Sequence, residues 1–368
     1  MRHLCGVAID ATSSGAAPNR APRLLSTKRV MVIMIRVASR RLPLVWRASF
    51  EHHRHSCPSH PDAFTAALAP LYPGAPARVF GPHPDTDTEE HIQARLALMD
   101  AAGVGLQVLS PAATRAPYGL DEQVAVHAAR LGNDLNAELV ERYPERFKSF
   151  VSLPLPHIDA SLRELRRGLD ELHMVGVNLH ISVLGRSVAE DEFLPIYEEM
   201  NRRAGLVFFH PCANGICSPM ITDYGLTAAV GTSLEDAAIA LHLIAKRIPS
   251  RFPAITFVIP HLGGPMPMLL ERLDNQFSMR HQNLPEPPSV TARRFYYDTV
   301  AHGSHAALLC AWKAFGADHL LPGSDYPVLL SFETYERTFS WIKEAEIPPA
   351  DIEQILLRTA PAVLRLDH

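Results

Sequence analysis

Short apolar runs alternate with longer amphipathic stretches along most of the chain. The runs consist mainly of Val, Ile, Leu and Phe, and their length is typical of strands that are buried on both faces. From residue 104 onward they predict strands at 105–110, 149–153, 175–181, 206–209, 254–259, 295–297 and 319–321. A further apolar run at 44–50 predicts a strand that precedes these seven.

The stretches between the strands have helical periodicity. In one of them, Leu162, Leu165, Leu169 and Leu172 recur at steps of three and four residues. The same kind of pattern predicts helices at 89–102, 121–142, 190–204, 232–248, 265–281 and 303–315. Strands that alternate with helices of this length form βαβ units, so the pattern predicts an α/β protein with a parallel sheet.

Eight predicted strands are the number that closes a (β/α)8 TIM barrel. Residues 44–368 exceed the roughly 250 residues that such a barrel needs. We assign the surplus to a small insertion after the first strand, at 58–88, which would distort the barrel. The alternative fold is a doubly wound open sheet, but no Gly-x-Gly-x-x-Gly motif follows any of the strands.

The N-terminal end differs from the rest of the chain in its charge. The first fifty residues contain nine Lys and Arg residues and a single acidic residue, Asp10. We therefore expect 1–43 to be a basic leader that precedes one barrel domain at 44–368. The leader is either dispensable, with Met31 or Met34 as the true start, or a targeting signal. Its short apolar run falls far below the roughly 20 residues that span a membrane.

The overall composition and the cysteines exclude some classes of protein and of site. The chain has 47% hydrophobic and 20% charged residues, as a folded protein does. Residues 51–368 have a formal charge of −12, which argues against nucleic acid as a partner. The cysteines are odd in number and scattered, so a reducing cytoplasm suits them and no disulfide framework is expected. Cys212 and Cys217 alone cannot complete a structural zinc site.

Side chains that can bind a metal follow four of the predicted strands. In a (β/α)8 barrel the active site lies at the carboxyl ends of the strands, so these positions are the ones that matter. Imidazole and carboxylate groups suit zinc, manganese or iron, with a coordination position left open for water or substrate. The candidates are Glu51, His53, His55, His210, His261 and Asp325.

Each candidate also has a structural interpretation. A single His after a strand is often a hydrogen-bonding group, and an Asp before Tyr-Pro often forms a turn. However, residues two apart in a strand point the same way, so Glu51, His53 and His55 can face one centre. Matched positions after four separate strands favour a metal site over four coincidences.

At these residues the sequence resembles the amidohydrolase superfamily, in particular its aminocarboxymuconate-semialdehyde decarboxylase and ortho-hydroxybenzoate decarboxylase group. The resemblance covers about residues 50–365 and is specific for the family but weakly specific for the substrate. The motifs that carry it are Glu51-x-His53-x-His55-x-x-Pro58, the segment 99–104, Phe209-His210-Pro211, His261-Leu262-Gly263-Gly264 followed by Arg272, Tyr297-Asp298-Thr299 and Gly323-Ser324-Asp325-Tyr326-Pro327.

The resemblance implies one divalent metal ion, with Zn²⁺ as the first choice and Mn²⁺ as the second. It implies that His53, His210 and Asp325 bind this ion. Subgroups of the family differ in the remaining ligand, which would be His55 in one and Glu51 in the other. This chain has both residues.

Two further residues receive roles from the resemblance. His261 matches a catalytic histidine that does not bind the metal. Arg272 matches an arginine that reaches the substrate carboxylate across a dimer interface, so the resemblance implies a homodimer. The alternative for Arg272 is an ordinary salt bridge within its own helix, with Glu271 or Asp274.

One absence and two departures qualify the resemblance. Two-metal members of the superfamily carry a modified Lys at the end of strand four, and the stretch 177–181 has no Lys, which implies a single metal. His180 ends this strand and has either a substrate-facing or a structural role. Glu51 stands where the semialdehyde decarboxylases have Asp, and Arg54 and Cys57 are unusual within the first motif.

The first functional hypothesis is therefore metal-dependent, non-oxidative decarboxylation of a small aromatic or unsaturated carboxylic acid. Asp325 would deliver a proton to the carbon that bears the carboxylate, with help from His261. The alternative is a hydrolase or hydratase that attacks an amide, a lactone or a conjugated acid through metal-bound hydroxide. A binding protein with a degenerate site is the third hypothesis. We expect neither nucleic acid nor a membrane as a partner.

Overall fold

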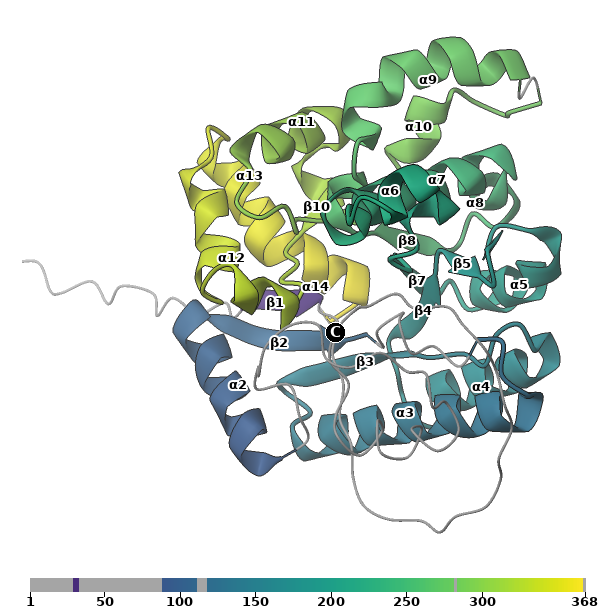
Figure 1. Ribbon diagram of the computed structural model, residues 1–368. Coiled ribbons are helices and arrows are strands. Elements are labelled where there is room, and N and C mark those ends of the chain that lie inside the picture. Colours follow the sequence, from purple (N-terminus) through teal and green to yellow (C-terminus); the bar gives the residue numbers. More distant parts are fainter. Residues whose placement is uncertain (1–28, 33–87, 111–117, 281–282, 367–368) are drawn as a thin grey trace, which may run out of the picture.

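The computed structural model describes residues 29–32, 88–110, 118–280 and 283–366 (Figure 1). Its main sheet has eight strands, and each strand pairs in parallel with the one that precedes it in the sheet. The strands are β1 (Arg29–Val32), β2 (Val104–Leu109), β3 (Phe147–Val151), β4 (Gly176–His180), β7 (Leu206–His210), β8 (Thr256–Ile259), β9 (Tyr296–Asp298) and β10 (Leu320–Leu321). This sequential order in a curled parallel sheet is like that of a TIM barrel.

The helices lie around the curled sheet and connect its strands (Figure 1). A short antiparallel hairpin, β5 (Ser182–Val183) with β6 (Arg186–Ser187), follows β4. The α-helices are α2 (Glu89–Ala102), α3 (Glu122–Arg142), α4 (Ile158–Asp170), α5 (Leu194–Arg202), α6 (Pro219–Thr222), α7 (Thr232–Ala245), α8 (Ile248–Arg251), α9 (Met266–Arg280), α10 (Pro288–Ala292), α11 (His305–Phe315), α12 (Arg337–Ser340), α13 (Pro349–Glu353) and α14 (Thr359–Leu364).

The seven strands predicted from residue 104 onward are confirmed, with bounds that differ by at most two residues. The predicted helices are also present. The largest shift is in the helix predicted at 190–204, because α5 begins only at Leu194, after the 3-10 turn Asp191–Phe193. The apolar pattern therefore located seven of the eight described strands of the main sheet and the longer helices, but not the hairpin or the short helices α6, α8, α10, α12, α13 and α14.

The first described strand, β1, lies outside the predicted strands. β1 lies inside the stretch 1–43, which we expected to be a leader outside the barrel domain, and it pairs with β2. β1 ends in Val-Met-Val, and β-branched apolar residues favour strands. The division into a leader and one barrel domain stays a prediction. The strand predicted at 44–50 and the insertion predicted at 58–88 fall outside the described residues, as does nearly all of the leader.

The inner face of the sheet is packed against the C-terminal helix. A small apolar cluster joins six strand residues to three residues of α14, and α14 also contacts β1 and β10, the two edge strands. The helix therefore closes one end of the curled sheet. The buried members of this inner cluster are Val108, Phe150, Leu206, Phe208, Val258, Leu321, Ala360, Val363 and Leu364.

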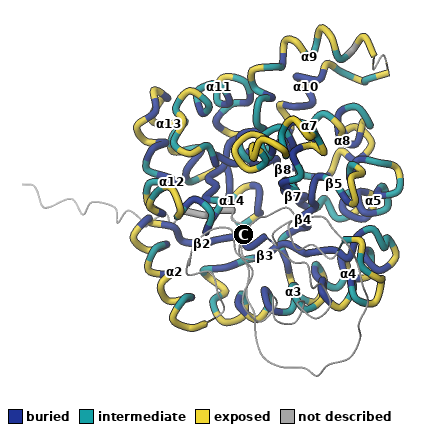
Figure 2. The backbone as a smooth tube through the Cα atoms, in the orientation of Figure 1, coloured by how far each residue is buried: buried dark blue, intermediate teal, exposed yellow. Residues whose placement is uncertain are grey.

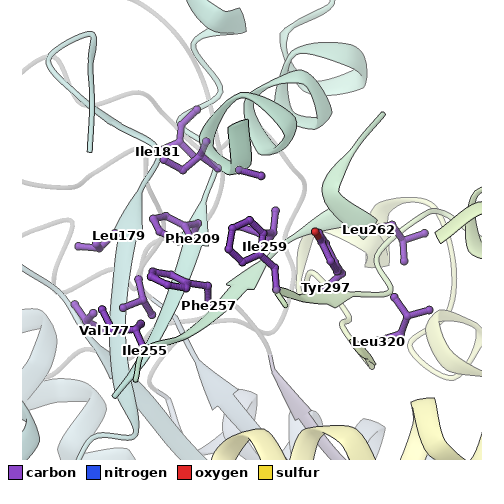
Figure 3. Close-up of a cluster of buried hydrophobic side chains, with 14 of the residues drawn as sticks. Val177, Leu179, Ile181, Phe209, Ile255, Phe257, Ile259, Leu262, Tyr297 and Leu320 are labelled. Atoms are coloured by element: carbon purple, nitrogen blue, oxygen red, sulfur yellow. The ribbon is translucent and has the colours of Figure 1, made fainter. Parts of the chain in front are cut away.

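The outer face of the sheet packs against the surrounding helices. Figure 3 shows part of this larger cluster, including Leu179, Phe209 and Phe257. Successive side chains alternate between the two faces of a strand, so Phe208 belongs to the inner cluster while Val207 and Phe209 belong to the outer one. Figure 2 shows the strands buried and the exposed residues on the outer sides of the helices. This alternation fixes which side chains point into the sheet's hollow.

One stretch of the described chain, Thr227–Ala245, is long and apolar enough by length and composition to cross a membrane. In the fold it forms the π-helical turn η4 (Thr227–Gly231) and α7. The buried side of α7 includes two acidic residues, Glu235 and Asp236, together with apolar residues such as Ile239 and Leu243. The helix is part of the layer that surrounds the sheet.

A buried ion-pair cluster between α4 and α5 allows a stability test. The carboxylate of Glu199 is almost fully buried and accepts hydrogen bonds from Arg166, Arg202 and Arg203. Burial raises the pKa of Glu199, but the hydrogen bonds from the arginines outweigh it and hold the pKa at about 2. We expect Glu199→Gln to lower the free energy of unfolding by about 2 kcal/mol at about pH 7, because it removes the charge that the arginines surround.

The sign of the pH effect follows from the lowered pKa. The contribution of Glu199 is fully present above the pKa of the unfolded chain and is lost as the pH falls towards the folded pKa. Urea unfolding should therefore show the difference between wild type and Glu199→Gln shrinking from about pH 5 to about pH 3. The exposed neighbour Glu198, changed to Gln, is the control and should alter stability little. A difference that does not change with pH would contradict this account.

Candidate active site

Polar side chains lie on the inner face of the sheet at the carboxyl ends of adjacent strands. On β4 the odd-numbered residues belong to the outer cluster, so Asn178 and His180 point inward. On β7 the inner residue Phe208 is followed two positions later by His210. Both histidines are buried, and their rings make a T-shaped contact with centroids 5.8 Å apart.

His210 has one nitrogen engaged and one buried without a partner. Its Nδ1 lies 2.6 Å from the carbonyl oxygen of Pro211, which can only accept, so Nδ1 carries the proton. Its Nε2 is buried and has no hydrogen-bond partner among the described residues. Burial lowers the pKa of His210 well below its ordinary value, and the nearby His180 adds to this. His210 therefore presents a neutral imidazole lone pair, which is what a metal ligand requires.

His180 is held in place by its neighbours in the site. Its Nδ1 lies 2.9 Å from the hydroxyl of Tyr118, and its Nε2 lies 3.3 Å from the side-chain amide of Asn178. Tyr118 also packs edge-on against the imidazole, with ring centroids 5.3 Å apart. These contacts give His180 a fixed orientation against the ring of His210.

Asp325 follows β10 in a strained backbone position, with φ 43°. Its Oδ1 is buried and has no hydrogen-bond partner among the described residues. Burial raises the pKa of its carboxyl to about 7; the nearby His261 opposes this increase, and Asp298 and Asp236 add to it. Asp325 therefore combines an unpaired buried oxygen with a strong need for a positive partner.

His261 follows β8 and is fixed through both its backbone and its side chain. Its backbone N–H donates to Oδ1 of Asp298 over 2.8 Å, and its Nδ1 donates to Oδ2 of Asp236 over 2.7 Å. Burial lowers the pKa of His261, but the charge of Asp236 and the hydrogen bond to it raise the pKa above its ordinary value. His261 is also within electrostatic range of Asp325 and His210.

The predicted metal ligands that the structure describes are chemically suited to a divalent cation. The described residues alone contain no cluster of three or more His, Cys, Asp or Glu side chains that could hold a metal. They do contain two buried donor atoms without partners, Nε2 of His210 and Oδ1 of Asp325. One nitrogen and one carboxylate oxygen match the preferences of zinc and manganese. The remaining predicted ligands, Glu51, His53 and His55, lie outside the described residues.

Arg272 lies on α9 and its side chain is exposed. In the described part of the chain it forms no ion pair with Glu271 or Asp274. Asp274 instead accepts hydrogen bonds from the backbone N–H and the hydroxyl of Ser289, at the start of α10. The alternative interpretation of Arg272, a salt bridge within its helix, is therefore not formed in the described part of the chain.

Asp236 and Tyr118 were not among the predicted site residues. Asp236 comes from α7, a helix that follows a different strand from His261, so no local motif joins the two. One signal was available, since Glu235 and Asp236 interrupt the apolar side of a predicted helix. Tyr118 had no comparable signal. Asp298 was part of a recognised motif but had no assigned contact.

Comparison with known proteins tests the resemblance. The family description "Amidohydrolase" matches residues 46–366. A 2-amino-3-carboxymuconate-6-semialdehyde decarboxylase of Dictyostelium discoideum is 27% identical over 63% of this chain and 66% of its own length. A gamma-resorcylate decarboxylase of Rhizobium radiobacter is 28% identical over 74% of this chain and 86% of its own length. A 2-keto-4-carboxy-3-hexenedioate hydratase of Sphingobium is 29% identical over 62% of this chain and 68% of its own length.

Solved structures show the same fold. A 5-carboxyvanillate decarboxylase of Sphingomonas paucimobilis has 25% identity and a TM-score of 0.66, covering 74% of this chain and 82% of that one. A dihydroxybenzoic acid decarboxylase of Polaromonas, solved with bound manganese, has 23% identity and a TM-score of 0.67, covering 77% and 88%. The predicted resemblance is confirmed: this chain is an enzyme of the amidohydrolase family.

Proposed function

We propose that the protein is a metal-dependent, non-oxidative decarboxylase of a small aromatic or unsaturated carboxylic acid. The observation that carries the proposal is that two buried atoms, His210 Nε2 and Asp325 Oδ1, have no hydrogen-bond partner among the described residues and lie near a histidine that a carboxylate holds. The named decarboxylases among its relatives support the same chemistry.

His210 and Asp325 would hold one divalent metal ion together with His53 and either His55 or Glu51. A bound ion at this place would stabilise negative charge on the carboxylate or hydroxyl oxygens of the substrate. We propose Zn²⁺ as the metal, with Mn²⁺ as the alternative that the Polaromonas structure supports.

The reaction assigned to the chain's own residues is a proton transfer followed by bond cleavage. The Asp325 carboxyl gives its proton to the carbon that bears the substrate carboxylate, so a C–H bond forms there. The bond between that carbon and the carboxylate then breaks, its electron pair returns to the conjugated system, and carbon dioxide leaves. The positive charge of His261 lowers the pKa of the Asp325 carboxyl, and so His261 assists the release of its proton.

Carbon dioxide release is the test. Purified protein loaded with Zn²⁺ or Mn²⁺ should release carbon dioxide from at least one acid in a panel of ortho-hydroxybenzoates and unsaturated dicarboxylic acids. The hydratase among the relatives makes water addition the competing reaction. Mass spectrometry separates the two, since decarboxylation lowers the mass of the substrate by about 44 Da and hydration raises it by about 18 Da. Water uptake or lactone hydrolysis without carbon dioxide release would replace the decarboxylase by the alternative.

The assembly and the rest of the fold are parts of the same proposal. In a homodimer, the exposed Arg272 would reach the substrate carboxylate in the partner's site, and its lack of an ion pair in the described chain supports this.

We also propose that the curled sheet closes into a complete, distorted barrel. In that barrel the insertion at 58–88 follows the ligand segment.

A further inference from the structure

Two neighbouring carboxylates on α7 have different surroundings. Glu235 and Asp236 are both fully buried, although they are adjacent in the sequence. Adjacent helical residues diverge by about 100° around the axis, so the two side chains reach different partners. The pair therefore offers an internal comparison between a carboxylate used for folding and one used for another purpose.

Glu235 is bound entirely by backbone. Its Oε2 accepts the N–H of Cys212 over 2.6 Å, and its Oε1 accepts the N–H groups of Asn214 and Gly215 over 2.8 and 2.9 Å. These three bonds fix the loop that follows His210. A carboxylate that satisfies three buried backbone donors contributes to stability, because those donors would otherwise be unpaired.

Asp236 has no such network. Its Oδ2 accepts the Nδ1–H of His261, and its Oδ1 is buried without a hydrogen-bond partner among the described residues. No arginine or lysine of the described chain forms an ion pair with it, and its one salt-bridge partner is His261. Burying a carboxylate with one unpaired oxygen costs free energy of folding, so stability alone does not explain an Asp at position 236.

The loop that carries His261 is held without Asp236. Asp298 fixes the backbone through the N–H groups of His261 and Val300. Gly264 packs closely against the backbone of Ser233, at the start of α7. A Cβ added at Gly264 would lie 1.9 Å from the carbonyl oxygen of Ser233. What Asp236 adds is a fixed imidazole, because a carboxylate can only accept and so requires the proton on Nδ1.

We propose that Asp236 is a positioning residue, which holds the imidazole of His261 with Nδ1 protonated and directs Nε2 to the opposite side, for the reaction rather than for folding. This inference rests on the proposed function in one respect, that His261 takes part in the reaction. The tautomer and the effect on folding can be measured without a known substrate.

The experiment compares Asp236→Asn with Glu235→Gln in the zinc-loaded, full-length protein. Asp236→Asn should leave the thermal unfolding midpoint unchanged or raise it, while kcat falls by about 100-fold and KM changes little. Glu235→Gln should lower the midpoint by a few degrees, because one carboxylate oxygen becomes an NH2 group that cannot accept. ¹⁵N NMR of labelled histidines, with His261 assigned from its own Gln variant, should show the Nδ1 proton of wild type lost in Asp236→Asn.

Each outcome decides the inference. If Asp236→Asn fails to fold, or melts at the lower midpoint of Glu235→Gln, Asp236 is structural and the inference is wrong. An unchanged Nδ1 signal, or an unchanged kcat, would overturn it equally. If wild type releases no carbon dioxide from any acid of the panel, the proposed function fails. The NMR signal and the unfolding midpoint then still decide whether Asp236 orients His261.

Discussion

Replacing Asp325 by Asn is expected to lower kcat for decarboxylation by about 1000-fold, although the amide keeps the shape of the side chain. The amide cannot donate the carboxyl proton to the substrate carbon. The variant also keeps the volume of a side chain whose Oδ1 is buried without a partner in the described chain. The measurement is carbon dioxide release at saturating substrate, with the metal content of each sample determined by elemental analysis.

The metal analysis separates the two roles given to Asp325. A variant that holds its metal and is inactive lacks the proton donor, whereas a variant that loses its metal has lost a ligand. Asp318→Asn makes the same chemical change at an exposed position shortly before β10 and should keep wild-type activity. Full activity of Asp325→Asn would remove Asp325 from the mechanism.

Replacing His210 by Ala is expected to weaken metal binding by at least about 100-fold and to abolish activity at low metal concentration. The Nε2 atom that it removes is the buried nitrogen without a partner in the described residues. In wild type, a chelator should lower the unfolding midpoint, because a metal that binds the folded chain stabilises it. In His210→Ala, this shift on adding the chelator should disappear.

His127 provides the matched control for that experiment. It lies exposed on α3, so His127→Ala should retain both the metal and the shift on chelation. Metal content is measured by equilibrium dialysis against Zn²⁺ and, separately, against Mn²⁺. If His210→Ala binds either metal as tightly as wild type does, His210 is not a ligand and the proposed metal site is wrong.

The sheet could be predicted because its strands are buried on both faces. Strands such as Leu206–His210 and Thr256–Ile259 form apolar runs that stand out from the amphipathic helices around them. β1 could not be predicted in this way. It has only four residues, and it lies within an Arg-rich stretch whose charge suggested a leader. Its place depends on pairing with β2, which no local pattern reveals.

The site could be predicted where its residues directly follow strands. His210, His261 and Asp325 could be chosen as candidates because the carboxyl ends of parallel strands meet at one end of the sheet. The structure adds that His261 is bound by Asp236, and that His210 Nε2 and Asp325 Oδ1 have no hydrogen-bond partner among the described residues. Asp236 was missed because it reaches the site from a helix, and helical residues are brought to a site only by tertiary packing. The roles of all the predicted site residues stay predictions, both for His210, His261 and Asp325 and for the others, which are Glu51, His53, His55 and Arg272.

The position of α14 has a consequence for how the protein is made. The inner cluster joins Val108 on β2 to Ala360, Val363 and Leu364 of α14, so its members are separated by most of the described chain. During synthesis, the early strands leave the ribosome long before the helix that covers their inner face. The hollow of the sheet can be sealed only after residue 364 has been made. Contacts between such distant residues also slow folding, so final packing of the interior is a late event.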